Sequence, residues 1–299
     1  MSIQFIGTHD RDLKMFERQY PLSAGMSYNS YFIDDQKTAV MDTVDARKTE
    51  EWLDLLKEAL DGRRLDYIIV QHMEPDHSAS LAAALEQHPN AKVVGNNKTF
   101  NMIHAFFPDL DLAIDRKLMV QDHDVLDLGS HKLHFIFAPM VHWPEVMLTY
   151  DSTDRVLFAA DAFGKFGCGD VEDDWVTEAR RYYFNIVGKY GPQVQTLLKK
   201  AAGLEIKKIY SLHGPLLTEN LDRYIKLYQT WSSYAPEESG VFIPVASIYG
   251  HTLEAARQAQ KMLEAKGVKT ELIDLTETDV SYAVAQAFRF DRMLLAASS

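Results

Sequence analysis

The chain has 299 residues, and 31 Lys and Arg side chains stand against 43 Asp and Glu side chains, so the formal net charge is −12. This acidic balance argues against a surface for nucleic acid or for an anionic membrane. A composition of 46% hydrophobic and 25% charged residues is typical of a globular protein and excludes a disordered or collagen-like chain.

No apolar stretch approaches the roughly 20 residues that a membrane helix needs, and the first residues lack the basic and apolar regions of a signal peptide. We therefore expect a cytoplasmic protein with no membrane partner. Cys168 is the single cysteine, which excludes an internal disulfide, iron–sulfur cluster or rubredoxin-type centre. Any redox chemistry must use other ligands.

Short strands alternate with amphipathic helices over the first three-quarters of the chain. The sequence predicts an antiparallel hairpin over 29–42 and a helix over 49–60 that ends at Gly62. A strand over 65–71 then leads through a polar segment into a helix over 78–85. This order predicts sheet layers covered by helices. Further strands are predicted at 92–95, 117–120, 131–138, 146–150, 155–160 and 206–212, and further helices at 98–106, 174–188, 192–202 and 218–231.

A second unit follows residues 232–240, whose small, charged, Pro and Gly residues are typical of a linker. The order of elements after it is βαβαβ, half of a doubly wound parallel sheet. We predict domains at 1–240 and 241–299. A complete doubly wound domain needs on the order of 140 residues, so we expect the second domain to be truncated. Its predicted elements are strands at 241–246, 269–275 and 292–297 and helices at 253–266 and 279–288.

The polar segment HMEPDH at residues 72–77 follows a predicted strand and carries four candidate metal ligands: His72, Glu74, Asp76 and His77. Three more candidates also follow predicted strands: His142, Asp161 and His213. Strand ends that converge on one sheet edge can bring these seven side chains together. Seven ligands suffice for two metal ions with the Asp161 carboxylate between them.

Each of these residues also has a structural interpretation. A lone histidine at a strand end is usually a satisfied polar residue, and Asp161 alone could be a turn or a helix cap. The 72–77 segment differs, because adjacent carboxylates and imidazoles are costly to bury without a cation. Four imidazoles and three carboxylates without a thiolate suit non-haem iron or manganese and also permit zinc. We assign structural or surface roles to the other histidines: His9, His88, His104, His123, His131 and His134.

The 72–77 segment, together with PMVHWPE, LFAADAFGKFG and YSLHGP, resembles the diiron site of the flavodiiron proteins, also called A-type flavoproteins. Related zinc hydrolases carry His-x-His-x-Asp-His, and Glu74 replaces the second histidine of that pattern. The resemblance implies a metallo-β-lactamase-like αββα sandwich followed by an incomplete flavodoxin-like segment. It also implies that one iron ion is held by His72, Glu74 and His142. The second would be held by Asp76, His77 and His213, with Asp161 bridging the two.

The segment SIYGHT lies between a predicted strand and a helix start and resembles the FMN phosphate loop of that family. Free backbone N–H groups at such a junction favour a phosphate. The candidate residues are Ser247, Tyr249, Gly250, His251 and Thr252. In the family, the loops that grip the flavin ring follow the third and fourth strands. We therefore do not expect the 299 residues alone to hold FMN.

The resemblance implies reduction of dioxygen to water, of nitric oxide to nitrous oxide, or of both, with electrons from an external donor through FMN. A rubredoxin or a flavin reductase would be the donor, and a head-to-tail homodimer is expected. Tyr28 is a candidate hydrogen-bond donor beside the metal ligands. Two alternatives stay open: a zinc-dependent hydrolase of the metallo-β-lactamase superfamily, and a truncated remnant without catalysis.

Overall fold

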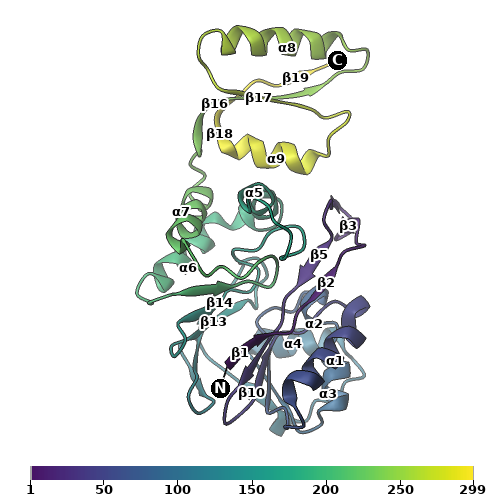
Figure 1. Cartoon of the computed structure of the whole chain (residues 1–299), viewed down its shortest axis with the longest axis vertical. Coiled ribbons are helices and arrows are strands. Elements are labelled where there is room, and N and C mark those ends of the chain that lie inside the picture. Colours follow the sequence, from purple (N-terminus) through teal and green to yellow (C-terminus); the bar gives the residue numbers. More distant parts are fainter. Residues whose placement is uncertain (1, 299) are drawn as a thin grey trace.

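Two β-sheets face each other in the computed structural model, which describes residues 2–298 (Figure 1). The first sheet has six strands, in spatial order β1 (Ser2–Phe5), β6 (Tyr31–Asp34), β7 (Ala39–Met41), β8 (Tyr67–Ile69), β9 (Lys92–Gly95) and β10 (Lys117–Met119). The second has five, β11 (Val125–Asp127), β12 (Lys132–Phe137), β13 (Met147–Asp151), β14 (Val156–Phe158) and β15 (Lys208–Tyr210).

Alternating side chains of these strands supply two cores. Tyr31 and Ile33 pack between the sheets, whereas Phe32 packs in the core under the helices. This is the pattern expected for a strand buried on both faces. Helices cover each sheet from outside, which confirms the predicted αββα sandwich (Figure 1). They are α1 (Thr49–Leu60), α2 (Pro75–Ser78), α3 (Leu81–Gln87) and α4 (Asn97–Phe106) on one side, and α5 (Val176–Tyr182), α6 (Gly191–Ala201) and α7 (Leu221–Ser232) on the other.

The helix predicted over 49–60 is confirmed, since α1 spans Thr49–Leu60 and both Asp61 and Gly62 after it have left-handed backbones. Two local predictions differ from the structure. The helix predicted at 174–188 is only partly α-helical, because α5 continues as a π-turn over Tyr183–Val187. The polar segment is not all loop, since Asp76 and His77 lie in the short helix α2. Single 3₁₀ turns occur at η1 (Ala46–Lys48), η2 (Ile114–Arg116) and η4 (Gly188–Tyr190).

An arm of short strands near the N-terminus was not predicted. Strand β2 (Thr8–Asp10) pairs with β5 (Met26–Tyr28), and β3 (Met15–Phe16) pairs with β4 (Tyr20–Pro21) at its tip. Figure 1 shows this arm projecting from the sandwich toward the C-terminal unit. The arm carries Phe16 and Tyr28, which lie beside the predicted metal ligands.

The C-terminal segment folds as a parallel βαβαβ unit, which confirms the doubly wound pattern. Its strands are β16 (Glu238–Ala246), β17 (Thr270–Asp274), β18 (Phe290–Met293) and β19 (Ala296–Ala297), and its helices are α8 (His251–Glu264) and α9 (Val280–Arg289). Strand β16 lies between β17 and β18, and the helices cover opposite faces (Figure 1). The first strand begins three residues before its predicted start, and the predicted last strand is split into β18 and β19.

Residues of α5 and the π-turn join this unit to the sandwich. The buried Arg181 donates from Nε to Oγ of Ser281 at 2.9 Å and from Nη2 to the carbonyl oxygen of Pro21 at 2.5 Å. The rings of Phe184 and Phe288 stack at 4.3 Å. Within residues 2–298, none of the helices is both long enough and apolar enough to cross a membrane.

Candidate metal centre

The candidate ligands lie at one edge of the two sheets because the strands before them run in the same direction. Asp161 and His213 each stand three residues beyond the paired strands β14 and β15, which are parallel. His72 likewise stands three residues beyond β8, and His142 follows β12. Pro75 at the first turn of α2 suits a helix start and places Asp76 and His77 next to Glu74.

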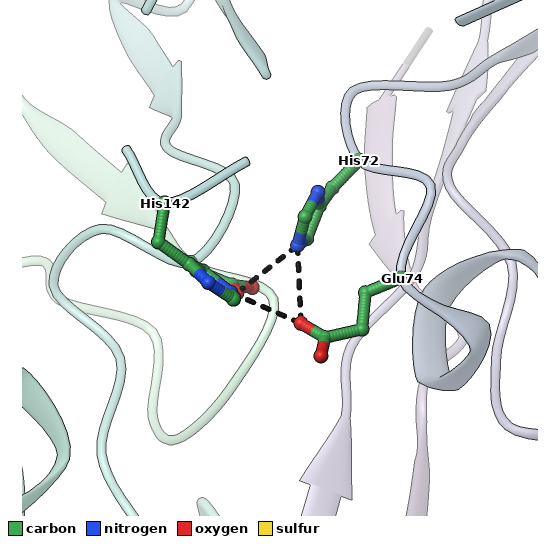
Figure 2. A group of neighbouring side chains, drawn as sticks. His72, Glu74 and His142 are labelled. Atoms are coloured by element: carbon green, nitrogen blue, oxygen red, sulfur yellow. Dashed lines mark hydrogen bonds and ion pairs between the residues drawn. The ribbon is translucent and has the colours of Figure 1, made fainter. Parts of the chain in front are cut away.

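One group of ligand atoms consists of His72, Glu74, His142 and Asp161, which approach within 4.8 Å of one another. Nε2 of His142 lies 2.9 Å from Oδ2 of Asp161 and 3.0 Å from Oε2 of Glu74. Nε2 of His72 lies 3.2 Å from the same Glu74 oxygen and 3.4 Å from Oδ2 of Asp161. Figure 2 shows His72, Glu74 and His142 pointing at one common centre.

The second group consists of Asp76, His77 and His213. The Nε2 atoms of His77 and His213 are 3.1 Å apart, and Oδ2 of Asp76 lies 3.4 and 3.3 Å from them. Oδ1 of Asp161 lies 3.2 Å from Nε2 of His77. The two oxygens of Asp161 thus face different groups.

The polar atoms of both groups are poorly satisfied by the protein alone. Within residues 2–298, both carboxylate oxygens of Asp76 and Oδ1 of Asp161 are buried without a hydrogen-bond partner. Buried polar groups without partners are rare in proteins. A divalent cation in each group would satisfy these atoms, and the carboxylate and imidazole donors suit iron, manganese or zinc. The residues present therefore fit a pair of metal ions.

Protonated imidazoles balance the carboxylates when only protein groups are considered. Burial lowers the pKa of His142, but hydrogen bonds with Asp161 and Glu74 outweigh this effect and raise the pKa to about 9. Burial also lowers the pKa of His72, yet the charge of Asp161 and the hydrogen bond with Glu145 hold it well above its usual value. Burial raises the pKa of Asp161, but the neighbouring histidines, His72 first, hold it well below its usual range. Without a metal, protonated imidazoles thus supply the positive charge beside the carboxylates, and bound metal ions would supply it instead.

Three supporting groups were missed in the sequence analysis. Nδ1 of His72 donates to Oε1 of Glu145 at 2.8 Å, and Nδ1 of His213 donates to the carbonyl oxygen of Ser27 at 2.7 Å. Oδ1 of Asp42 accepts from the backbone N–H groups of Gln71 at 2.7 Å and His72 at 3.2 Å. Glu145 stands in the same PMVHWPE motif as His142, which was its one signal in the sequence. The other two contacts join residues far apart in the chain.

A cavity of about 410 Å³ opens beside the ligands and is lined in part by Glu74, Asp76, Tyr28 and Arg47. The Tyr28 hydroxyl accepts a hydrogen bond from Nη2 of Arg47 at 2.8 Å, and its ring lies 6.1 Å from that of His213. Tyr28 is thus close to the ligands, as its candidate role requires. Burial and the nearby charge of Glu74 raise the pKa of Glu17, at the tip of the arm, to about 8.

The rings of Phe16 and Tyr182 lie 5.4 and 5.5 Å from the ring of His213. Tyr182 is fully buried, and burial together with the charge of Asp161 holds the pKa of its phenol well above the usual value. Neither ring was predicted from the sequence to lie near the ligands. The rings of Phe16 and Tyr182 thus cover the second group of ligands with apolar surface.

The five candidate phosphate-loop residues lie between β16 and the first turn of α8. Gly250 has a left-handed backbone (φ 86°), and a side chain there would meet no atom within 4 Å. Its N–H donates to Oγ of Ser247 at 3.1 Å, and the hydroxyl of Thr252 lies 2.9 Å from that of Ser298. Tyr249 is 86% exposed. The junction thus offers an open space at a helix start, which suits a phosphate group.

Two facing sheets between helix layers, with a carboxylate and imidazole cluster at the strand ends, define a metallo-β-lactamase-like domain with a candidate site for two metal ions. Residues 26–214 match the family described as ODP family beta lactamase. The crystal structure of the flavodiiron protein from Giardia intestinalis superposes with a TM-score of 0.88 at 28% identity, covering 95% of this chain and 70% of that one.

Two curated relatives extend the comparison. Diflavin flavoprotein A 1 of Synechocystis sp. is 32% identical over 290 residues, which cover 93% of this chain and 49% of the relative. Anaerobic nitric oxide reductase flavorubredoxin of Vibrio vulnificus is 30% identical over 313 aligned positions, which cover 100% of this chain and 62% of the relative. The chain thus spans about half the length of the diflavin relatives. It belongs to the ODP β-lactamase-like family and to the flavodiiron proteins, which confirms the resemblance found in the sequence.

Proposed function

We propose that this chain carries the diiron centre of an oxidoreductase that reduces dioxygen to water, nitric oxide to nitrous oxide, or both. The observation that carries the proposal is the Asp161 carboxylate, whose two oxygens face two separate groups of ligands. Glu74 in the first group supports iron over zinc, since zinc hydrolases of this fold carry histidine there. The printed name of the Vibrio vulnificus relative, a nitric oxide reductase, supports this reaction class.

One iron ion would be held by His72, Glu74 and His142, and the other by Asp76, His77 and His213, with Asp161 between them. When bound, such a pair supplies electrons and open coordination positions for a diatomic gas. The protein's part is to fix the donor atoms and to limit water. Phe16 and Tyr182 cover His213 with apolar surface. The backbone carbonyl of Ser27 holds Nδ1–H of His213, so that Nε2 faces the site.

We assign Tyr28 the role of a hydrogen-bond donor to the bound gas or its products. Burial raises the pKa of its phenol well above the usual value, so the hydroxyl stays protonated at neutral pH. Arg47 already supplies a hydrogen bond to the phenol oxygen. The Tyr28 proton is therefore left to point into the cavity that Glu74 and Asp76 also line.

We also propose that residues 247–252 supply the phosphate contacts of an FMN site, and that electrons come from a rubredoxin or a flavin reductase. The open space at Gly250 and the helix start support the first part. The second part, and a head-to-tail homodimer, rest on the family resemblance. Calorimetric titration of the chain with inorganic phosphate measures the phosphate contact, and a Gly250→Val variant, which fills the open space, is expected to weaken it.

The experiment is to load the chain anaerobically with ferrous iron and to follow uptake of dioxygen and of nitric oxide with a chemical reductant. Two irons per chain and consumption of at least one gas are expected. Two zinc ions in purified protein, with ester hydrolysis and no gas consumption, would establish the hydrolase alternative instead. Two irons without gas consumption would favour a non-catalytic remnant.

A further inference from the structure

The two groups of ligands differ in the groups that accept a hydrogen bond from Nδ1 of their histidines. In the first group, Nδ1–H of His72 donates to Oε1 of Glu145 at 2.8 Å, and both side chains are fully buried. The same oxygen accepts from the backbone N–H of Met73 at 2.8 Å. The backbone oxygen of Glu145 accepts from Nδ2 of Asn96 at 2.6 Å, which anchors this residue. A buried carboxylate therefore holds the ring of His72 with Nε2 toward Glu74 and Asp161.

Within residues 2–298, no carboxylate accepts a hydrogen bond from Nδ1 of either histidine of the second group; the charge of the buried Asp42 acts on His77 without a hydrogen bond between them. Nδ1 of His213 donates to a neutral backbone carbonyl, that of Ser27. Nδ1 of His77 is buried without a hydrogen-bond partner among the residues that the structure describes. The carboxylates that face the second group are Asp76 and the shared Asp161.

A carboxylate behind a ligating histidine acts in two ways. It fixes the tautomer, and it makes the imidazole a stronger donor by drawing on the Nδ1 proton. Its charge also attracts a cation, and water screens this attraction only weakly at a fully buried site. Loss of such a partner typically lowers metal affinity about 10–100-fold.

We propose that the two positions bind metal unequally, and that Glu145 makes the position of His72, Glu74 and His142 the tighter one. This inference rests on the proposed function only in that both positions take a metal ion. Glu145 is a positioning residue, because it reaches the metal only through His72. The tighter position fills first, and the position of His77 and His213 fills second.

Glu145→Gln separates charge from structure. The glutamine carbonyl oxygen can still accept from Nδ1–H of His72 and from the N–H of Met73, so the hydrogen bonds survive while the negative charge is lost. Glu58→Gln is the matched control, because Glu58 is an exposed residue of α1, a helix that carries none of the candidate ligands. The probe is cobalt(II), whose visible absorption reports each site, titrated anaerobically into the metal-free full chain with a competing chelator.

The wild-type chain is expected to bind two cobalt ions in two resolved steps. In a His213→Ala background, which retains the first position, Glu145→Gln is expected to weaken binding 10–100-fold. In a His142→Ala background, which retains the second position, the same change is expected to leave affinity within about twofold. Glu58→Gln should change neither.

Equal affinities for the two wild-type steps would overturn the inference, as would tighter binding by the His142→Ala chain than by the His213→Ala chain. Neither measurement uses the Glu145→Gln variant, so both still test whether the two positions bind metal unequally if that variant fails to fold. Equal weakening of both positions by Glu145→Gln would also overturn it. Stepwise binding of two metals without any gas reduction would refute the proposed function and leave this inference standing, whereas a chain that binds no metal refutes both.

Discussion

Asp161 and His77 meet across the middle of the cluster, with Oδ1 of the carboxylate 3.2 Å from Nε2 of the imidazole. The other oxygen of Asp161 lies 2.9 Å from Nε2 of His142. One side chain therefore connects two groups of ligands that come from different strands. Because each oxygen serves one group, the side chain has to keep both oxygens as acceptors.

Asp161→Asn tests this connection. An amide nitrogen cannot bind a cation, so one group loses an oxygen and the charge shared between the groups is lost. We expect the metal content to fall from two ions per chain to one or fewer, measured by inductively coupled plasma mass spectrometry after anaerobic loading. Asp127→Asn, an exposed position on β11, is the control and should keep two. An Asp161→Asn chain that also keeps two ions would contradict the bridging role.

Metal binding should release protons. The pKa of His142 is raised to about 9, so this imidazole carries a proton at pH 7 in the metal-free chain, and the pKa values of His72 and His77 are raised as well. A ligating imidazole must give up its proton. Calorimetric titrations at pH 7 in two buffers of different ionisation enthalpy should show at least one proton released per chain on metal binding, and fewer at pH 9.5. Equal heats in both buffers at pH 7 would be inconsistent with protonated ligands.

The stability of the metal-free chain should fall as the pH rises above neutral. The pKa of His142 rises from 6.5 to about 9 on folding, so its contribution is complete below about pH 6.5 and is lost as the pH rises through 9. We expect the melting temperature of the metal-free chain to fall between pH 6.5 and 9.5. His142→Gln should flatten part of this slope. A slope that is identical in the variant and the wild type would show that His142 does not contribute.

Asp42 should matter for stability, although it touches no metal. Its carboxylate accepts from the backbone N–H groups of Gln71 and His72, and Asp42→Ala would leave both donors buried and unpaired. We expect the free energy of unfolding to fall by about 1–3 kcal/mol, measured by urea denaturation. Asp42→Asn should be milder, because Oε1 of Gln71 lacks a partner within residues 2–298 and a flipped Gln71 amide could accept from the new amide.

Because the pKa of Asp42 is raised, the difference in stability between the wild type and Asp42→Asn should depend on pH. Burial raises it to about 6 despite the hydrogen bonds. A carboxyl with a raised pKa stabilises the fold fully below its unfolded value near 4 and loses this contribution as the pH rises through 6. As the pH rises from about 4 to 6.5, the wild type should therefore lose stability relative to the Asp42→Asn variant. If the two curves run parallel over this range, Asp42 does not titrate there.

Arg181 should tie the C-terminal unit to the sandwich. Its guanidinium donates to Ser281 on α9 and to Pro21 on the arm, and it lies 4.1 Å from the ring centroid of Tyr282. Arg181→Ala leaves Glu178 without its cation and removes these contacts. Each buried hydrogen-bond acceptor left unsatisfied typically costs about 1–3 kcal/mol. Hydrogen exchange of α9 should accelerate strongly, and Arg223→Ala on the exposed face of α7 should leave it unchanged. Unaltered exchange in Arg181→Ala would mean that other contacts hold the units together.

The sequence predicted those parts of the fold whose signal is local. The apolar face of α1, with Trp52 and Leu56, has helical spacing, and the ligands at 72–77 stand together in the chain. The arm at β2–β5 was missed because strands of two or three residues show no period. Glu145 was missed because its partner, His72, is 73 residues earlier, and only the fold brings the two together. The π-turn after α5 likewise has no periodic signal.

X-ray diffraction at the iron absorption edge, from crystals of the chain loaded anaerobically with ferrous iron, locates the metal ions and their ligands. We predict two anomalous peaks per chain. One should lie within reach of His72, Glu74 and His142, the other within reach of Asp76, His77 and His213, and both should contact Asp161. A single peak, or two peaks that do not share Asp161, would contradict it.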